Sequence, residues 1–192
     1  MDNFNKKPFP TIKVIFAILG LILLGEVIYA VIVLKSPVAA PPPAPTTVSQ
    51  PTVGRISLDA PKTKYQLAEI IPVSVMIDTG SNTIDGVDFI VKFPKILEAT
   101  QGGLIKGTIL DEYPLMSVDA SKGLISISGV NSTGGFKGIG QFAVINFKAK
   151  KTGQSSLIVD FQKDSTIDSN LVETDTSKDI LEQVDNLEIE VQ

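Results

Sequence analysis

The stretch that decides the fold is Ile84–Ala99, IDGVDFIVKFPKILEA. In an extended strand, successive side chains point to opposite faces of the sheet. One face of this stretch is uniformly apolar and should lie in a core: Val87, Phe89, Val91 and Phe93. The other face mixes a carboxylate, an aliphatic chain and an amine: Asp88, Ile90 and Lys92. Pro94 has no N–H to donate to a neighbouring strand, so the regular pairing should end there.

The residue inventory excludes several classes of chemistry. The 192-residue chain has no Cys, His or Trp, which excludes thiol catalysis, histidine general-base catalysis, disulfides and Cys/His zinc sites. Residues 36–192 carry 13 Lys and Arg against 19 Asp and Glu, without a basic run, and this argues against a nucleic-acid partner. We therefore expect a protein that is not an enzyme and needs no cofactor or metal.

The N-terminal segment is typical of a membrane anchor. Residues 14–34, VIFAILGLILLGEVIYAVIVL, are apolar except for Glu26, and about 20 such residues in a helix span the hydrocarbon core of a bilayer. Three lysines precede this span and Lys35 follows it, so the positive-inside rule predicts a cytoplasmic tail at residues 1–13 and an extracellular C-terminal domain. The expected location is the cell membrane, with the single pass running from Val14 to Leu34.

A cleaved signal peptide is the alternative interpretation of this segment. Signal peptides have a shorter apolar region, of about 7–15 residues, and a small-residue cleavage site. The best such site here, Val38-Ala39-Ala40, runs into Pro41. We therefore favour a retained anchor. Glu26 is interpreted as a protonated or snorkelling group, although a functional carboxylate within the membrane is the other possibility.

Residues 35–52 form a Pro-rich linker. The segment Ser36–Pro51 holds six of the twelve prolines and no charged residue, a composition that favours extended polyproline II rather than a packed core. Such a stalk can hold the following domain on the order of 40–50 Å from the bilayer.

Residues 53–192 are expected to form one all-β domain. Nine short apolar runs alternate with Gly- and Asx-rich turns, and no stretch before Thr176 has a helical period. The candidate strands are Arg55–Ala60, Ile70–Asp78, Val87–Phe93, Gly103–Ile109, Leu115–Val118, Leu124–Val130, Gln141–Lys150, Ser156–Phe161 and Leu187–Val191. Nine strands with one apolar face each predict a jelly-roll β-sandwich of two stacked sheets. We expect the last strand to pair near the first, so that both ends of the domain lie together.

The order of these segments resembles the cohesin domain family, over about Val53 to Val191. The resemblance rests on IIPVSVMID at Ile70–Asp78, on GVDFIVKF at Gly86–Phe93 followed by Leu97-Glu98, and on GIGQFAVINFKAK at Gly138–Lys150. Cohesins are non-catalytic modules that capture dockerin-bearing proteins in polysaccharide-degrading assemblies. The resemblance therefore implies a dockerin-like protein partner, bound on one sheet face that includes the aspartate of the third strand. Asp88 occupies the matching position.

Alternation alone selects the same face and extends it. The residues expected beside Asp88, Ile90 and Lys92 are Leu124, Ser126 and Ser128, together with Phe142, Val144 and Asn146. Hydrogen-bonding groups around exposed apolar side chains are what a protein interface requires. From this set we predict a partner-binding surface made of Asp88, Ile90, Lys92, Ser126, Ser128, Phe142 and Val144.

Other functions remain open. Direct carbohydrate binding would need exposed aromatic rings, and the domain has no Trp and two tyrosines, Tyr65 and Tyr113. A structural role in the cell envelope is a further alternative. Asp160, Asp164 and Asp168 could bind Ca²⁺, but they lack EF-hand spacing, and a solvated loop is the simpler interpretation. Asp85 and Asp88 could form a glycosidase pair, although nothing in their sequence context favours this.

Overall fold

The computed structural model describes residue 16, residues 19–24, 26 and 29, and residues 53–192. Two compact units divide the chain at Val48 and Ser49. The described residues of the first unit are helical and solvent-exposed. Most of the expected anchor, the whole tail and the whole linker lie outside the described residues, and none of the helical segments described is long and apolar enough to cross a bilayer.

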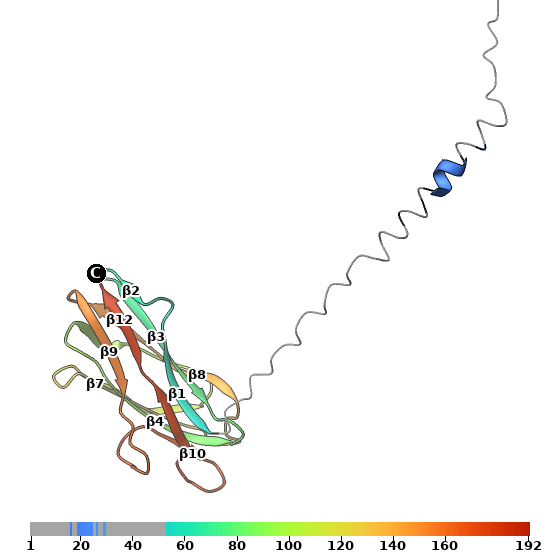
Figure 1. Ribbon diagram of the computed structural model, residues 1–192. Coiled ribbons are helices and arrows are strands. Elements are labelled where there is room, and N and C mark those ends of the chain that lie inside the picture. The colour runs from blue at the N-terminus through green and yellow to red at the C-terminus, as the bar shows by residue number, and fades with distance from the viewer. Residues whose placement is uncertain (1–15, 17–18, 25, 27–28, 30–52) are drawn as a thin grey trace, which may run out of the picture. The chain divides into compact units, whose positions relative to one another are not determined.

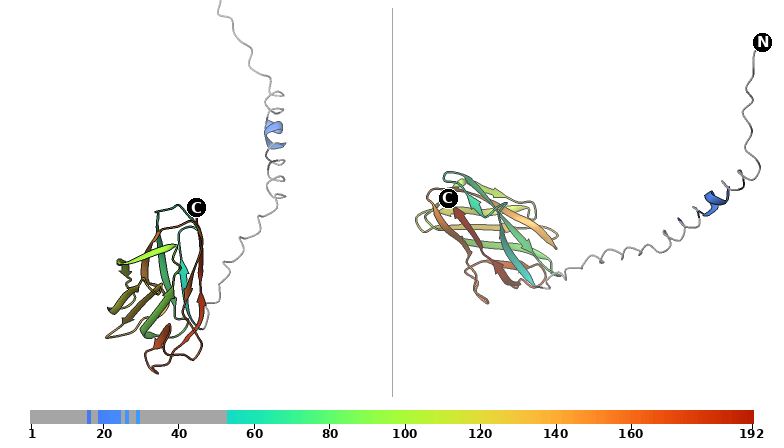
Figure 2. Two further views of the ribbon diagram at one scale, coloured as in Figure 1. Left: turned by 90° about the vertical axis from the view of Figure 1, so that its left-hand side faces the viewer. Right: turned by 45° about the horizontal axis from the view of Figure 1, so that its top comes forward.

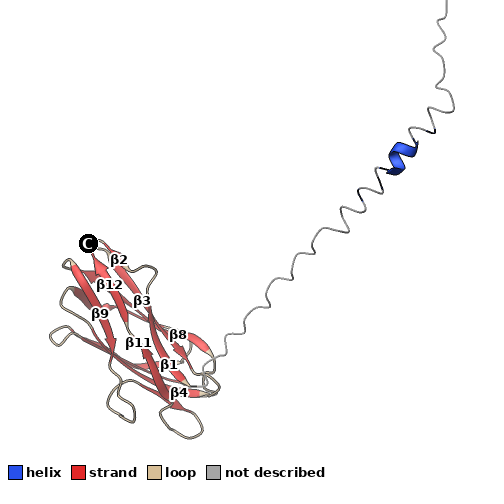
Figure 3. Cartoon of the chain, in the orientation of Figure 1, coloured by secondary structure: helices blue, strands red, loops and turns tan. Residues whose placement is uncertain are grey.

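The second unit contains only strands and connecting loops between residues 53 and 192 (Figure 3). Its strands form two sheets that stack as two layers (Figures 1 and 2). The first sheet has the order β11 (Leu181–Asp185), β1 (Gly54–Asp59), β3 (Ile70–Asp78), β8 (Ile139–Ala149), β5 (Leu97–Lys106). The second has the order β2 (Lys64–Tyr65), β12 (Leu187–Val191), β9 (Gly153–Val159), β4 (Ile84–Lys92), β7 (Leu124–Val130), β6 (Glu112–Asp119), with β10 (Asn170–Glu173) also paired to β4. The expected two-sheet β-sandwich is confirmed.

The core lies between the two sheets and follows the alternation of the strands. On β4, Val87, Phe89 and Val91 are at most 1% exposed, and Phe93 just beyond the strand is 8% exposed. Strand β3 contributes alternate residues from Ile71 to Ile77, all of them fully buried. The core face predicted from the opening stretch is therefore correct.

All nine expected strands are present, and the structure adds three short ones, β2, β10 and β11. These three have two to five residues and little apolar alternation. Such segments carry almost no local strand signal and are stabilised by the neighbours they pair with. Strands β9 and β10 together act as one interrupted strand, because Val159 and Asn170 both pair antiparallel with β4, opposite Val91 and Asp88.

The expected pairing of the last strand with the first is wrong. Strand β12 pairs with β9 and β2, whereas β11 lies beside β1, parallel to it. The chain crosses between the sheets at Asn186, whose side-chain oxygen accepts a hydrogen bond from the N–H of Val159 at 2.9 Å. Because β11 runs parallel to β1 and leads into β12, the C-terminus lies at the end of the domain opposite Gly54 (Figure 1).

We predict that Gly123→Ala destabilises the domain, whereas Gly102→Ala does not. Gly123 has a φ of +66°, and a Cβ there would lie 2.5 Å from the carbonyl oxygen of Phe93. The positive φ and the short distance to the carbonyl oxygen both disfavour a side chain at this position. The free energy of unfolding should therefore fall by at least about 1–2 kcal/mol in Gly123→Ala. At Gly102 a Cβ would meet no atom within 4 Å, and the change should stay within about 0.5 kcal/mol. Urea unfolding of the Ser49–Gln192 unit measures both; equal losses would contradict the prediction.

Candidate functional site

The outer face of strands β9, β4, β7 and β6 brings together most of the predicted surface. Strands β4 and β7 are antiparallel neighbours in which Asp88 pairs with Ser128, Ile90 with Ser126, and Lys92 with Leu124. Directly paired residues point to the same side of a sheet. The two strands therefore place these six residues on one face, as the alternation predicts.

The polar groups of this face largely satisfy one another. The Ser128 hydroxyl donates to Asp88 Oδ1 at 2.5 Å, and Lys92 Nζ forms an ion pair with Asp160 Oδ1 at 2.8 Å. At the β6–β7 turn, the Ser121 hydroxyl and the Lys122 N–H donate to Asp119 and hold the pKa of that carboxyl at about 2. The middle of the face carries hydroxyl and aliphatic groups without charge.

Two of the predicted residues, Phe142 and Val144, do not belong to this face. They lie on β8, which is in the other sheet. Val144 is half-buried on the outer side of that sheet, between Ser74 of β3 and Ile105 of β5. Asn146, also on β8, pairs with Pro72 of β3. Alternation assigns a residue to a side of its own sheet but does not say in which sheet the strand lies. The expectation that β8 extends the Asp88 face is therefore wrong.

Phe142 is a core residue because β8 contains a bulge. Val75 pairs with Ala143 and Met76 pairs with Gln141, which leaves Phe142 as an extra residue. An inserted residue interrupts the alternation of its strand, so Phe142 and Ala143 both point inward and are fully buried. The side chain of Phe142 is therefore not accessible to a partner, and the prediction that it contributes to the binding surface is wrong.

Tyr113 on β6 holds the bulge in place. Its ring stacks on Phe142 with 5.3 Å between ring centroids, and its hydroxyl donates to the Phe142 carbonyl oxygen at 2.6 Å. The N–H of Gly107 donates to the same oxygen at 2.8 Å. Gly129 leaves room for the ring, since a Cβ there would lie 2.7 Å from it. Burial raises the pKa of the Tyr113 phenol to about 12.

The structure adds aliphatic residues to the face that were not selected from the sequence. Leu115 pairs with Ser128 and Ser117 pairs with Ser126, so β6 continues the face on one side. Ile158 pairs with Lys92 and continues it on the other. Leu115 and Ile158 are 44% and 46% exposed, and Val130 at the end of β7 is 39% exposed. Period-two alternation in β6 and β9 would have identified these residues once the strand order was known.

The alternatives to a protein interface gain no support from the described residues. No aromatic ring between residues 53 and 192 is an exposed side chain: Tyr65 is 2% exposed, and Tyr113 is half-buried against Phe142. A flat sugar platform is thus lacking in this domain. Asp160, Asp164 and Asp168 do not converge, and within the described part of the chain no three acidic residues are placed to hold a metal ion.

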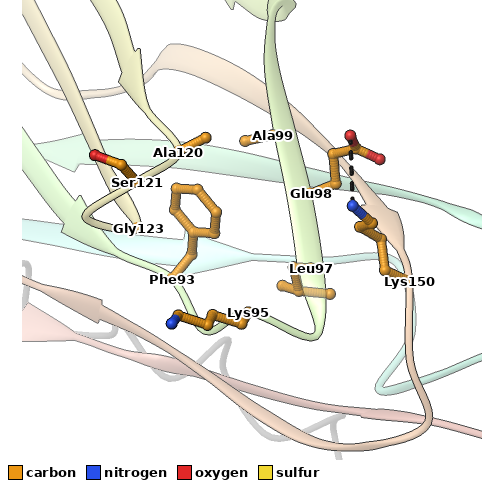
Figure 4. Close-up of a pocket in the computed structure, with 9 residues that line it drawn as sticks. All are labelled: Phe93, Lys95, Leu97, Glu98, Ala99, Ala120, Ser121, Gly123 and Lys150. Carbon is orange, nitrogen blue, oxygen red and sulfur yellow. Dashed lines mark ion pairs between the residues drawn. The ribbon is translucent and has the colours of Figure 1, made fainter.

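A separate pocket of about 390 Å³ lies at one end of the sandwich, between the β6–β7 turn and the start of β5 (Figure 4). The Phe93 ring, Leu97 and Ala99 form its apolar part. Lys150 reaches Glu98 across its rim at 3.8 Å. The pocket brings together no pair of groups with catalytic geometry, and it shares none of the residues predicted for the partner surface.

Comparison with solved structures identifies the fold. A cohesin from the archaeon Archaeoglobus fulgidus, described as non-cellulosomal, is 16% identical with a TM-score of 0.56 and covers 73% of this chain and 91% of its own. The seventh ScaB type I cohesin of Pseudobacteroides cellulosolvens is 21% identical with a TM-score of 0.57 and covers 73% and 92%.

The third ScaC cohesin of Acetivibrio cellulolyticus, solved in complex with the ScaB dockerin, is 14% identical with a TM-score of 0.58 and covers 72% and 98%. No family model and no curated protein matches the sequence. The structural likeness shows that the domain has a cohesin-like fold.

We predict that Tyr113 makes the stability of the domain depend on pH above 10. The folded state holds the phenol pKa at about 12, whereas an unfolded tyrosine ionises near 10. Because the folded pKa is raised, the contribution of Tyr113 is fully present below pH 10 and is lost as the pH rises toward 12. Urea unfolding of the domain and of its Tyr113→Phe variant between pH 8 and 11.5 should give stabilities that converge with rising pH. Parallel curves would contradict the assignment.

Proposed function

We propose that this chain is a membrane-tethered, non-catalytic receptor module that docks a dockerin-type protein through the outer face of β9, β4, β7 and β6. The observation that carries the proposal is the character of that face. It holds serine hydroxyls from β6 and β7 beside Ile90, Leu115 and Ile158, and the lysine at the end of β4, Lys92, already forms an ion pair with Asp160.

Such a face can be covered by a partner at low cost. Burying an unpaired charge raises the free energy of the complex, whereas burying aliphatic groups lowers it. Hydroxyl groups can donate or accept hydrogen bonds across the interface. The exposed aliphatic chains, Ile158, Leu115 and Val130, are spread over three of the four strands and over both ends of the sheet. A partner covering all of them would span the whole face.

The solved neighbours support this choice of partner. Cohesins from Acetivibrio cellulolyticus and Clostridium thermocellum that share the fold were crystallised with dockerins. The sequence places Asp88 at the position that resembles the interface aspartate of the family. The Ser128 hydroxyl occupies Oδ1 of Asp88, which leaves its other carboxylate oxygen for a donor on the partner.

The membrane location is proposed from the N-terminal sequence. The apolar residues 14–34, the preceding lysines and the following Pro-rich linker favour a single pass with the domain outside the cell. Absence of Cys and His from the whole chain is the reason for proposing a binding role rather than catalysis.

A bulky charge in the middle of the face should abolish docking. Ser126 lies on β7 between Ile90 and Ser117, so Ser126→Arg places a large cation at the centre of the surface. Ile105→Arg is the matched control, since Ile105 is 49% exposed on the other sheet. Immobilised Ser49–Gln192 should capture a dockerin-bearing protein from the host's secreted proteins, and the affinity should fall at least about a hundredfold, roughly 2.7 kcal/mol, for Ser126→Arg alone. Equal capture by both variants would refute the face assignment.

The anchor predicts that the full chain stays in membranes after alkaline carbonate extraction, whereas Ser49–Gln192 does not. Replacing Ile22 and Leu23 by Lys should release the full chain, because each charge near the centre of a span disfavours insertion by about 2.5–3.5 kcal/mol. Ser36→Lys, outside the span, is the control. A mature chain that begins after Ala40 would identify a cleaved signal peptide instead.

A further inference from the structure

A notch interrupts the proposed docking face at Gly86, on the N-terminal half of β4. Gly86 pairs with Val172 of β10 on one side and with Val130 of β7 on the other, so the two valine side chains lie on the same face, one on each side of Gly86. Glycine contributes no side chain between the two valines. A depression of about 340 Å³ lies here, and its lining includes Gly86, Val130 and Val172 together with Asp85, Asp88 and Asn131.

Close packing of β10 on β4 shapes the notch. A Cβ on Gly86 would lie 3.3 Å from the Cβ of Val172, closer than ordinary contact. The side chain of Val172 therefore packs directly beside the buried backbone of Gly86. Val130 is 39% exposed, and Val172 is half-buried. These aliphatic walls suit a hydrocarbon chain three or four carbons long.

The lysines of this sheet already have ion-pair partners, whereas two carboxylates beside the notch have none among the described residues. Lys92 pairs with Asp160 at 2.8 Å, Lys122 in the β6–β7 turn with Asp119 at 3.2 Å, and Lys64 with Glu190 at 3.1 Å. Among the described residues, no lysine or arginine lies within 4.0 Å of the carboxylates of Asp85 or Asp88. The lining of the notch thus combines apolar groups with Asp85 and Asp88, and the carboxylates of these two residues form no ion pair with a described lysine or arginine.

We propose that the notch at Gly86 receives a lysine or arginine side chain of the docked protein. The hydrocarbon stem would lie over Gly86 between Val130 and Val172, and the cationic head would reach Asp85 and the free oxygen of Asp88. Long basic side chains bind in this way, with the stem on apolar surface and the charge at a polar rim. A charge-assisted hydrogen bond to a carboxylate is about twice as strong as a neutral one.

This inference deepens the proposed function and rests on it, because it names the partner group that enters one part of the docking face. It predicts that the partner carries a basic residue opposite the β10 end of β4, and residues compatible with hydroxyl and aliphatic groups along the rest of the sheet. A basic side chain here would fix the direction in which the partner lies across the strands, since the other end of the face has its charges paired.

The test is an NMR titration of the ¹⁵N-labelled Ser49–Gln192 unit with N-acetyl-arginine amide. We expect this probe to shift the amide signals of Gly86, Asp88, Val130 and Val172. N-acetyl-norleucine amide, with a similar stem and no charge, should leave them unchanged. The Asp85→Asn, Asp88→Asn double variant keeps the size of both side chains and should weaken binding of the arginine probe at least about tenfold.

The control variant carries Asp59→Asn and Glu98→Gln, which remove the same charge from the other sheet and should bind the probe as the unmodified unit does. Equal shifts with the norleucine probe, or equal binding by both variants, would overturn the proposal. Shifts of the same amides by CaCl₂ at lower concentration than by the arginine probe would also overturn it and assign the two aspartates to a metal ion.

These results are independent of the docking experiment. If Ser126→Arg abolishes capture of the partner but the notch does not bind the arginine probe, the docking face stands and the basic anchor is wrong. If the notch binds the probe but Ser126→Arg leaves capture unchanged, the function proposed for the face is wrong. In a captured partner, the basic residue can be replaced by methionine. This replacement should weaken binding to the unmodified unit at least about tenfold. It should weaken binding to the Asp85→Asn, Asp88→Asn variant much less, because the carboxylates that pair with the basic residue are already absent there.

Discussion

The burial of one side of β4 constrains the rest of the domain. Phe89 and its neighbours on that side are almost completely removed from water. A strand alternates strictly, and a slip of one residue would bury Asp88 and Lys92 and expose Phe89. The cost of burying those charges fixes the register with β7 and hence the cross-strand pairs Asp88–Ser128 and Ile90–Ser126. The composition of the outer face is therefore set by the packing of the inner one.

This coupling explains which parts of the structure could be predicted from the sequence. The two sides of β4 and β7 were predicted correctly because alternation is a local property of each strand. Which strands share a sheet is a non-local property, and here the sequence offered no guide: β8 has the same alternating pattern as β7 but lies in the opposite layer. Phe142 shows a second limit. Its inward orientation results from a bulge opposite Val75 and Met76, and a bulge depends on the partner strand as much as on its own residues.

The short strands β10 and β11 were missed for a related reason, and β10 is important for the site. Strand β10 has four residues and forms because β4 offers an unpaired edge beyond the end of β9. Ser169, fully buried, completes the junction: its hydroxyl oxygen lies 3.0 Å from the N–H of Ile90. Without β10, Gly86 would lie at an open edge, and Val172 would not form a wall of the notch. Short strands with weak sequence signals can therefore shape a binding surface.

The parallel pairing of β1 with β11 places Gly54 and the C-terminus at opposite ends of the domain, and this has a mechanical consequence. A pull applied to the chain before Gly54 acts along β1, which is held by β3 on one side and β11 on the other. Tension between opposite ends of paired strands loads their hydrogen bonds in shear, so that many must break at once instead of one after another from an end. A domain tethered at Gly54 and held by a partner on its sheet face would then resist a pulling force better than a hairpin whose hydrogen bonds break one after another.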